Sequence, residues 1–318
     1  MHPAKSVIAF TTLSGAGYGL LVWLAALAPF ALLPAGAWFA IAAAGLALGL
    51  VAAGLLASTL HLGHPERAWR ALSQWRSSWL SREGLAALAT FVPAGAFALA
   101  AAILGFADRL TILAGLLSAI GALATVFSTA MIYASLKAVP AWASRATPAA
   151  YLALAGLTGA ALAHPLLRLW DAPGADMAGA GVLVLGLAGL AVKAAQWHRI
   201  DTGEAASTAE TATGLGRFGQ VRLLEAPHDQ PNYLMKEMGF AIARKHAGAL
   251  RRLAMLFAFF APAGLAFIAL FVGGGAATAC AVLSAPVCLA GVAIERWLFF
   301  AEARHVVTLY YGRSLAAC

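Results

Sequence analysis

Long uncharged stretches dominate the pattern of apolar and polar positions along the chain. The clearest cover residues 6–32, 36–60, 110–136 and 253–294. A run of about 18 or more apolar residues predicts a membrane span, and the span must be helical because backbone groups in hydrocarbon have no water to pair with. The pattern predicts eight spans, at about 7–32, 37–62, 84–105, 110–136, 149–166, 178–197, 249–274 and 277–300.

Composition agrees with that pattern. Of the 318 residues, 62% are apolar and 11% are charged, against roughly 45–50% and 25% in soluble domains. A soluble fold of this size cannot bury so much apolar surface. We therefore predict an all-α integral membrane protein, with residues 1–318 forming one bundle of eight transmembrane helices. Gly15 and Gly19, four residues apart in the first span, suit close helix–helix contact.

The basic residues predict how the bundle is oriented. Eight spans place both termini on one side, and of the 21 lysines and arginines all except Arg109 and Arg168 fall on that side. The positive-inside rule then predicts cytoplasmic termini for a multi-pass protein of a bacterial inner membrane. These charges flank spans and form no separate basic domain, which argues against nucleic-acid binding.

The loop from about 198 to 248 is the one large segment outside the predicted spans. Residues 201–219 are small and polar and predict irregular structure. Residues 232–252 have apolar side chains at helical spacing among basic ones, which predicts an amphipathic helix leading into the seventh span. We expect it either to dock a partner or to lie in the membrane interface with no partner.

Metal chemistry by the chain itself is not expected. Its three cysteines form no CxxC pair and no Cys/His cluster, so they predict neither an iron–sulfur cluster nor a zinc site. No histidine lies near the middle of a predicted span, so we expect no haem. The string from Gly214 to Gly219 matches GxGxxG but lacks the strand that a dinucleotide-binding unit requires before it.

Ionisable residues gather at the ends of the second and eighth predicted helices. His61 ends the second, and near the end of the eighth Glu295, Glu302 and His305 share one face beside Arg296. Charges at these depths are costly unless they pair or face a cavity. Two interpretations remain open: a proton relay to a quinone headgroup, or an interhelical salt-bridge cluster that closes the end of the bundle.

Several of these stretches together resemble a known family. They are the opening Met-His-Pro-Ala-Lys-Ser-Val-Ile, residues 11–19, the string His-Leu-Gly-x-Pro-x-Arg-Ala from His61, Leu-Ser-Arg-Glu from Leu80, and the ending Arg296, Phe299, Phe300 and His305. Over essentially all eight spans the chain resembles the membrane-anchor subunit of the dimethyl-sulfoxide-reductase family of complex iron–sulfur molybdoenzymes.

The resemblance implies partners, a cofactor and a site. It implies a haem-free anchor that exchanges electrons between ubiquinone or menaquinone and a four-cluster iron–sulfur subunit, which serves a molybdopterin catalytic subunit. It ties His61 to quinone binding, and we expect Arg296, Glu302 and His305 nearby. For docking the iron–sulfur partner we expect five basic residues: Arg70, Arg76, Lys236, Arg244 and Lys245.

Two features favour one branch of that family. The charge asymmetry puts the termini in the cytoplasm, and the loop at 198–248 is longer than in the best-known sulfoxide reductase anchor. Both resemble the branch whose molybdoenzyme faces the cytoplasm and oxidises sulfite. The alternatives are a quinol-oxidising anchor of a sulfoxide reductase and, in another class, a secondary transporter. A transporter is disfavoured because the chain shows no repeated halves and no charge pair near the middle of a span.

Overall fold

A computed structural model describes residues 4–60, 62–202, 207–225, 227 and 246–311, and all regular elements in these ranges are helical. Within these ranges eight helices are long and apolar enough to cross a membrane. Their lengths of 23 to 28 residues correspond to about 35–42 Å at 1.5 Å per residue. The prediction of an all-α membrane bundle is confirmed. The spans are α1 with η1 (Lys5–Leu27, Ala28–Phe30), α2 (Ala37–Thr59), α3 (Trp79–Leu104), α4 (Arg109–Ala134), α5 (Ala146–Leu169), α6 (Ala175–Thr202), a seventh made of α10, η4 and α11 (Ala247–Met255, Leu256–Phe260, Ala261–Phe271), and α12 (Gly274–Ala301).

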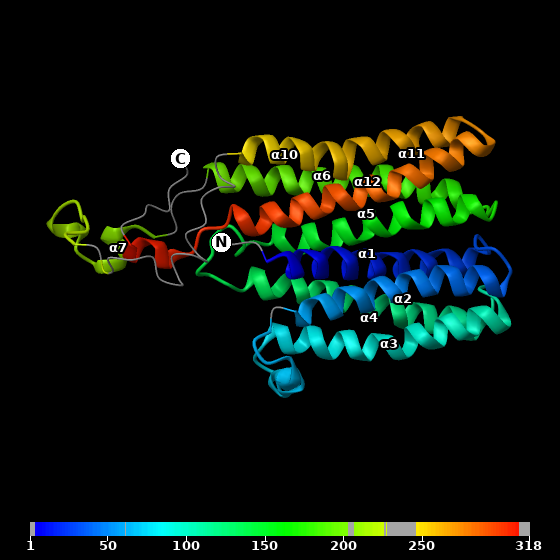
Figure 1. Cartoon of the computed structure of the whole chain (residues 1–318), viewed down its shortest axis with the longest axis horizontal. Helices are drawn as coiled ribbons and strands as arrows, with labels where there is room; N and C mark the ends of the chain where they lie inside the picture. Colours follow the sequence, from blue (N-terminus) through cyan, green and yellow to red (C-terminus); the bar gives the residue numbers. More distant parts are fainter. Residues whose placement is uncertain (1–3, 61, 203–206, 226, 228–245, 312–318) are drawn as a thin grey trace.

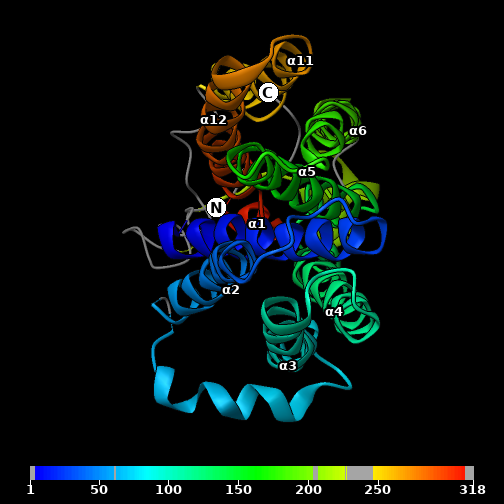
Figure 2. The ribbon, with the colours of Figure 1, turned by 90° about the vertical axis from the view of Figure 1, so that its right-hand side faces the viewer.

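Helix α1 lies at the centre of the bundle (Figures 1 and 2). On one side of it are α2, α3 and α4, and on the other are α5, α6, α12 and the seventh span; α1 itself contacts α2, α4, α5 and α12. We call the end where α1 begins the loop end and the opposite end the far end. Arg109 is the first residue of α4 and Arg168 lies near the end of α5, so both are at the far end.

Glycines let α1 approach its neighbours at backbone distance. A Cβ on Gly17 would come within 2.5 Å of the Ala47 carbonyl oxygen of α2, and one on Gly19 would overlap the Ala155 carbonyl oxygen of α5. Trp23 of α1 also donates a hydrogen bond of 2.9 Å to the Gly156 carbonyl. The expected close contact is therefore present at Gly19 but not at Gly15, where a Cβ would meet nothing within 4 Å.

Helices α3 and α5 illustrate how the ends of spans differ from their expected positions. Helix α5 continues past Pro165 to Leu169, because a proline removes the hydrogen bond to the preceding turn without preventing the helix from continuing beyond it. Helix α3 begins at Trp79, five residues earlier than expected, and the Ser78 side chain accepts the Ser81 N–H as its cap. This earlier start places Glu83 inside the span.

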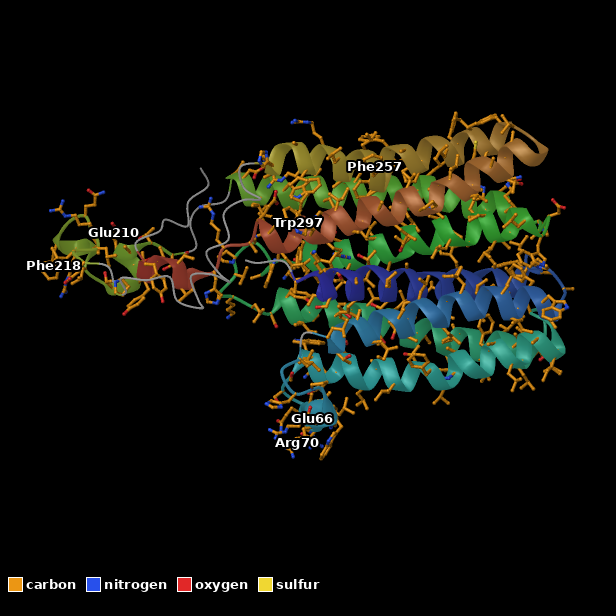
Figure 3. All side chains as sticks on the ribbon, in the orientation of Figure 1. Glu66, Arg70, Glu210, Phe218, Phe257 and Trp297 are labelled. Atoms are coloured by element: carbon orange, nitrogen blue, oxygen red, sulfur yellow. The ribbon has the colours of Figure 1, made fainter. Side chains whose placement is uncertain are left out.

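Short elements stand outside the bundle at the loop end. Helix η2 (Pro65–Gln74) precedes α3, α7 (Ala209–Thr213) and η3 (Gly216–Phe218) belong to the long loop, and η5 (Val306–Tyr311) follows α12; Figure 3 labels Glu210 and Phe218 there, and Glu66 and Arg70 on η2. In the GxGxxG string Gly214 ends α7 with φ of 69°, and no strand precedes it within residues 207–225. Most of the expected amphipathic helix at 232–252 lies outside the described residues.

The contact between α1 and α5 generates a stability prediction. Gly19→Ala should lower the free energy of unfolding by about 1–3 kcal/mol or more, because its methyl group would overlap backbone that cannot move freely. Gly15→Ala is the matched control and should leave stability unchanged, since its methyl group meets open space. The measurement is the thermal unfolding midpoint of the purified chain in detergent. Equal midpoints for the two variants would contradict the backbone contact.

Candidate functional site

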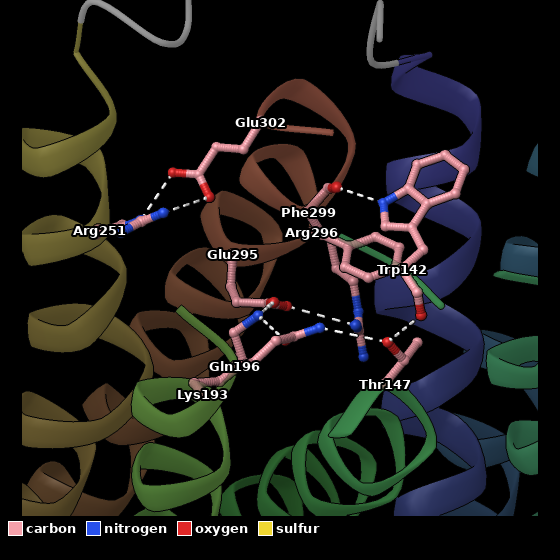
Figure 4. Close-up of polar contacts among 9 residues, drawn as sticks. All are labelled: Trp142, Thr147, Lys193, Gln196, Arg251, Glu295, Arg296, Phe299 and Glu302. Carbon is pink, nitrogen blue, oxygen red and sulfur yellow. Dashed lines mark hydrogen bonds and ion pairs between the residues drawn. The ribbon is translucent and has the colours of Figure 1, made fainter. Parts of the chain in front are cut away.

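Three charged side chains lie buried together toward the loop end of the bundle (Figure 4). Lys193 of α6 places its Nζ 2.6 Å from Oε1 of Glu295 on α12, and Arg296 Nη1 lies 3.4 Å from the other carboxylate oxygen. All three side chains are almost completely inaccessible to solvent. We call Lys193, Glu295 and Arg296 the ionic cluster. It is an interhelical pair with a second cation beside it, so it has one positive charge in excess.

Neutral side chains connect the ionic cluster to α5. Gln196 accepts a 2.6 Å hydrogen bond from Lys193 Nζ and donates one of 3.3 Å to the Thr147 hydroxyl. Thr147 in turn donates to the Trp142 carbonyl at 2.7 Å, and the Trp142 indole donates to the Phe299 carbonyl at 2.7 Å. These bonds tie α6, the start of α5 and the end of α12 into one polar layer.

Aromatic rings cover the second cation of the cluster. The guanidinium carbon of Arg296 lies 3.6 Å from the centroid of the Tyr151 ring, a cation–π contact. Tyr151 stacks on Tyr133 of α4 with ring centroids 5.9 Å apart, and Tyr133 also contacts Phe299 and Phe300 edge-on at 5.5 and 5.3 Å. The two tyrosines thus extend the cluster from α12 across to α4.

A fourth buried ionisable group, Glu83, contacts α4 one helical turn before Tyr133. Its side chain, on the second turn of α3, is 5% exposed and accepts a 2.5 Å hydrogen bond from the Thr129 hydroxyl of α4. Within the described residues no lysine, arginine or histidine forms an ion pair with it. An ionisable residue inside a span that lacks a counter-charge is a functional-site hypothesis by default.

Two of the expected site residues take part in ion pairs of their own. Arg296 belongs to the ionic cluster, and Glu302, just beyond α12, binds Arg251 of α10 through contacts of 2.8 and 3.2 Å. Arg251 also binds Asp201 at 2.6 Å, which joins α6, α10 and α12. Burial raises the pKa of Glu302 above its usual range although the Arg251 guanidinium acts in the opposite direction. Glu295 and Glu302 are therefore both bound to a cation of another helix, as the salt-bridge interpretation of the sequence predicts.

The remaining expected residues are placed less closely together. His305 lies three residues beyond Glu302; its Nδ1 accepts the Val307 N–H at 3.0 Å, and burial lowers its pKa. Arg70 and Arg76 lie on and next to η2 and are exposed. Four other expected residues are outside the described residues, namely His61, Lys236, Arg244 and Lys245.

The sequence pattern did not single out Lys193 and Glu83. Lys193 falls four residues from the end of its predicted span and was grouped with the charges outside the membrane, whereas it is buried and bound to Glu295. Glu83 stood one residue before its predicted span. In each case the signal was a charge within one or two turns of an apolar run, which marks either a solvated end or a buried functional group.

Comparisons with known proteins place these features in a family context. The model of the family described as DMSO reductase anchor subunit (DmsC) matches residues 1–312. A protein of Allochromatium vinosum that is named as a sulfite dehydrogenase subunit is 34% identical over 327 residues, a match that covers 98% of this chain and 99% of that protein. No solved structure matches the chain.

The charge count of the ionic cluster predicts unequal effects of removing its members. Glu295→Gln leaves two buried cations without a carboxylate and should cost about 3–5 kcal/mol of stability. Lys193→Met leaves Glu295 paired with Arg296 and should cost less. Adding Lys193→Met to Glu295→Gln should restore part of the loss, measured as the thermal midpoint in detergent.

Glu66→Gln, which removes the exposed pair with Arg67, is the control for that series and should change stability by about 0–1 kcal/mol. Equal and additive losses for Lys193→Met and Glu295→Gln would show that the cluster does not behave as one electrostatic unit.

Proposed function

Because the chain belongs to the DMSO reductase anchor subunit family, DmsC, we propose that it is the quinone-reactive subunit of a molybdoenzyme complex that oxidises sulfite. Its coarser role follows from the family and the eight spans: it is a multi-pass membrane anchor subunit. The relative named as a sulfite dehydrogenase subunit supports sulfite as the electron source. Sulfite oxidation releases two electrons, and a quinone bound at the anchor accepts two electrons and two protons.

The observation that supports quinone chemistry most directly is Glu83. Its carboxylate is buried in the span, it accepts its hydrogen bond from a neutral hydroxyl, and no cation among the described residues compensates it. A carboxylate in such surroundings can change protonation state without breaking an ion pair, so it suits proton exchange with a bound carbonyl compound. A buried carboxyl group of this kind is compatible with a quinone carbonyl, and in this proposal Glu83 holds or moves one proton of a quinone headgroup.

His61 belongs with Glu83 in this proposal. Helix α2 ends at Thr59, two residues before His61, and packs against α3, whose first turns contain Glu83. The described end of α2, which His61 follows in sequence, and Glu83 are therefore both at the loop end of neighbouring helices. An imidazole that titrates near neutral pH can donate a hydrogen bond to a carbonyl oxygen and exchange a proton with the aqueous side.

In the same proposal, Arg296 of α12 and the residues that follow α12, Glu302 and His305, act from the other half of the bundle. Arg296 lies on the α12 side of two stacked rings: its guanidinium carbon is 3.6 Å from the Tyr151 ring, and Tyr151 stacks on Tyr133 of α4. Glu302 and His305 lie nearer the loop end and exchange protons with the water outside. Helix α1 separates α12 from α2 (Figure 2), so these groups act on the site from its opposite side.

Electron delivery determines how the partners are arranged. The iron–sulfur subunit, with four clusters as the family resemblance implies, docks at the loop end, using Lys236, Arg244 and Lys245 of the long loop against an acidic surface. Charges at the rim of such an interface set its register and association rate more than its affinity. Electrons then reach a quinone near Glu83 without crossing the bilayer.

The proposal predicts a selective loss of quinone activity. In the purified complex, Glu83→Gln should lower sulfite-dependent quinone reduction by about 10²-fold or more while reduction of an artificial dye by the catalytic subunit stays unchanged. His61→Ala should behave in the same way. Glu66→Gln, which alters an exposed carboxylate at the same end of the bundle, should leave both activities intact. Normal quinone turnover in Glu83→Gln would refute this role.

The cytoplasmic position of the loop end is a separate prediction. With the native cysteines replaced, single cysteines at Ala107, which is exposed at the far end, and at Ala212, which is exposed on α7, should differ in reactivity toward an impermeant thiol reagent applied to whole cells. Ala107→Cys should be labelled and Ala212→Cys should not. The reverse pattern would place the catalytic subunits outside the cytoplasm and favour sulfoxide reduction over sulfite oxidation.

A further inference from the structure

Helix η2 lies beside the bundle at the loop end and not over it. In Figure 1 it projects from the start of α3, away from α1, and Figure 2, which looks along the spans, shows it running across their direction. It is therefore parallel to the plane of the membrane. The helix next to it, α3, has the smallest buried share of the eight spans found in the described residues, so most of the surface of α3 is available for contact with lipid.

The side chains of η2 form separate apolar and basic stripes. In a 3₁₀ helix the residues at i and i+3 lie above one another. Trp69, Leu72 and Trp75 accordingly form one stripe that includes the turn after the helix, and Arg67, Arg70 and Arg76 form another, with Ser73 at the intervening position. Trp69 is 67% exposed and Trp75 is 47% exposed. This amphipathic pattern has a period of three residues.

Contacts with α3 determine which way the apolar stripe points. A Cβ on Gly84 would lie 3.0 Å from the Leu72 side chain, so Leu72 packs against the second turn of α3. Ser81 donates to the Ala71 carbonyl, and Arg82 donates to the Trp75 and Arg76 carbonyls at 2.8 and 2.7 Å. The two tryptophans on either side of Leu72 are thereby held at the level where a membrane span begins.

Two arginines of the basic stripe, Arg70 and Arg76, have no carboxylate partner in the part of the chain that the structure describes. Glu66 is the one carboxylate of η2, and it already lies 3.1 Å from His64 and 3.6 Å from Arg67. Within the described residues Arg70 and Arg76 form no ion pair; their guanidinium groups instead lie 5.5 and 5.0 Å from the rings of Trp69 and Trp75. Each of these pairs therefore presents an aromatic ring and a cation side by side.

We propose that η2 is an interfacial helix whose Arg70 and Arg76 bind the phosphates of anionic phospholipids, with Trp69 and Trp75 inserted at the headgroup level. Tryptophan is enriched at membrane interfaces, and basic residues close to an anionic surface are attracted to its phosphates. Position favours lipid over a protein partner, because a protein seated on the loop end of the bundle would stand beside η2 while lipid lies beneath it. The bound phospholipid would anchor the start of α3 and hence the turn that contains Glu83.

The test uses the full chain with its native cysteines replaced by alanine and Ser73→Cys labelled with an environment-sensitive fluorophore. It is reconstituted in vesicles of phosphatidylcholine with and without phosphatidylglycerol. Nitroxides at the headgroup should quench the label more than nitroxides at the middle of the acyl chain or iodide in the water. At equal mole fraction, nitroxide-labelled phosphatidylglycerol should quench more than its phosphatidylcholine counterpart.

Charge removal tests the arginines themselves. Arg70→Gln with Arg76→Gln should lower the preference for phosphatidylglycerol on the order of fivefold per arginine removed. Arg217→Gln with Arg222→Gln is the matched control, because it removes two exposed arginines from the long loop, one of them also stacked on an aromatic ring, Phe218, at 4.6 Å. This control should leave the preference unchanged.

Two outcomes would overturn the proposal. Quenching by iodide and not by headgroup nitroxides would place η2 in water and exclude lipid as its occupant. Equal quenching by the two lipids, unchanged by loss of Arg70 and Arg76, would show that no anionic headgroup is recognised. The measurement needs no quinone activity, so it is independent of the function proposed for Glu83.

Discussion

Backbone contact along α1 is the constraint on which the arrangement of this bundle depends. Gly17 and Gly19 face α2 and α5, and at both positions a single methyl group would meet a carbonyl oxygen of the neighbouring helix. Lipid offers no hydrophobic force that pushes apolar helices together, so close packing of small residues has to supply the attraction. Since α1 contacts helices of both halves, its position sets how far apart the polar groups of the two halves lie.

Those polar groups form one layer near the loop end. The ionic cluster on α6 and α12 has an excess of one positive charge, and Glu83 on α3 is the buried carboxylate that no cation contacts among the described residues. Tyr151, which contacts Arg296, stacks on Tyr133 of α4, the helix that also provides Thr129 as the hydrogen-bond donor to Glu83. Glu83 therefore has no counter-charge among the described residues, and burial of this kind disfavours the ionised form of a carboxyl group.

Within this layer, the partner of each carboxylate distinguishes charges that stabilise the fold from those that are candidates for function. Glu295 and Glu302 each bind a cation from another helix, which explains how charges are tolerated at the end of α12. Glu83 has a neutral partner, Thr129. On the surface, Arg67 forms an ion pair with Glu66, while Arg70 and Arg76 contact tryptophan rings. Both in the polar layer and at η2, the residues to which we assign a role beyond folding are those whose charge has no oppositely charged partner among the described residues.

Sequence alone determined the class of fold, because an apolar run long enough to cross a bilayer must be a helix wherever it occurs. It also indicated that the end of α12 is charged, and it left open whether those charges pair, since pairing depends on helices that are distant in the chain. Only the tertiary structure decided that Lys193 is buried against Glu295 and that Glu83 lies inside α3. A charge within two turns of a helix end can face water or a neighbouring helix, and packing, which periodicity does not encode, makes that choice.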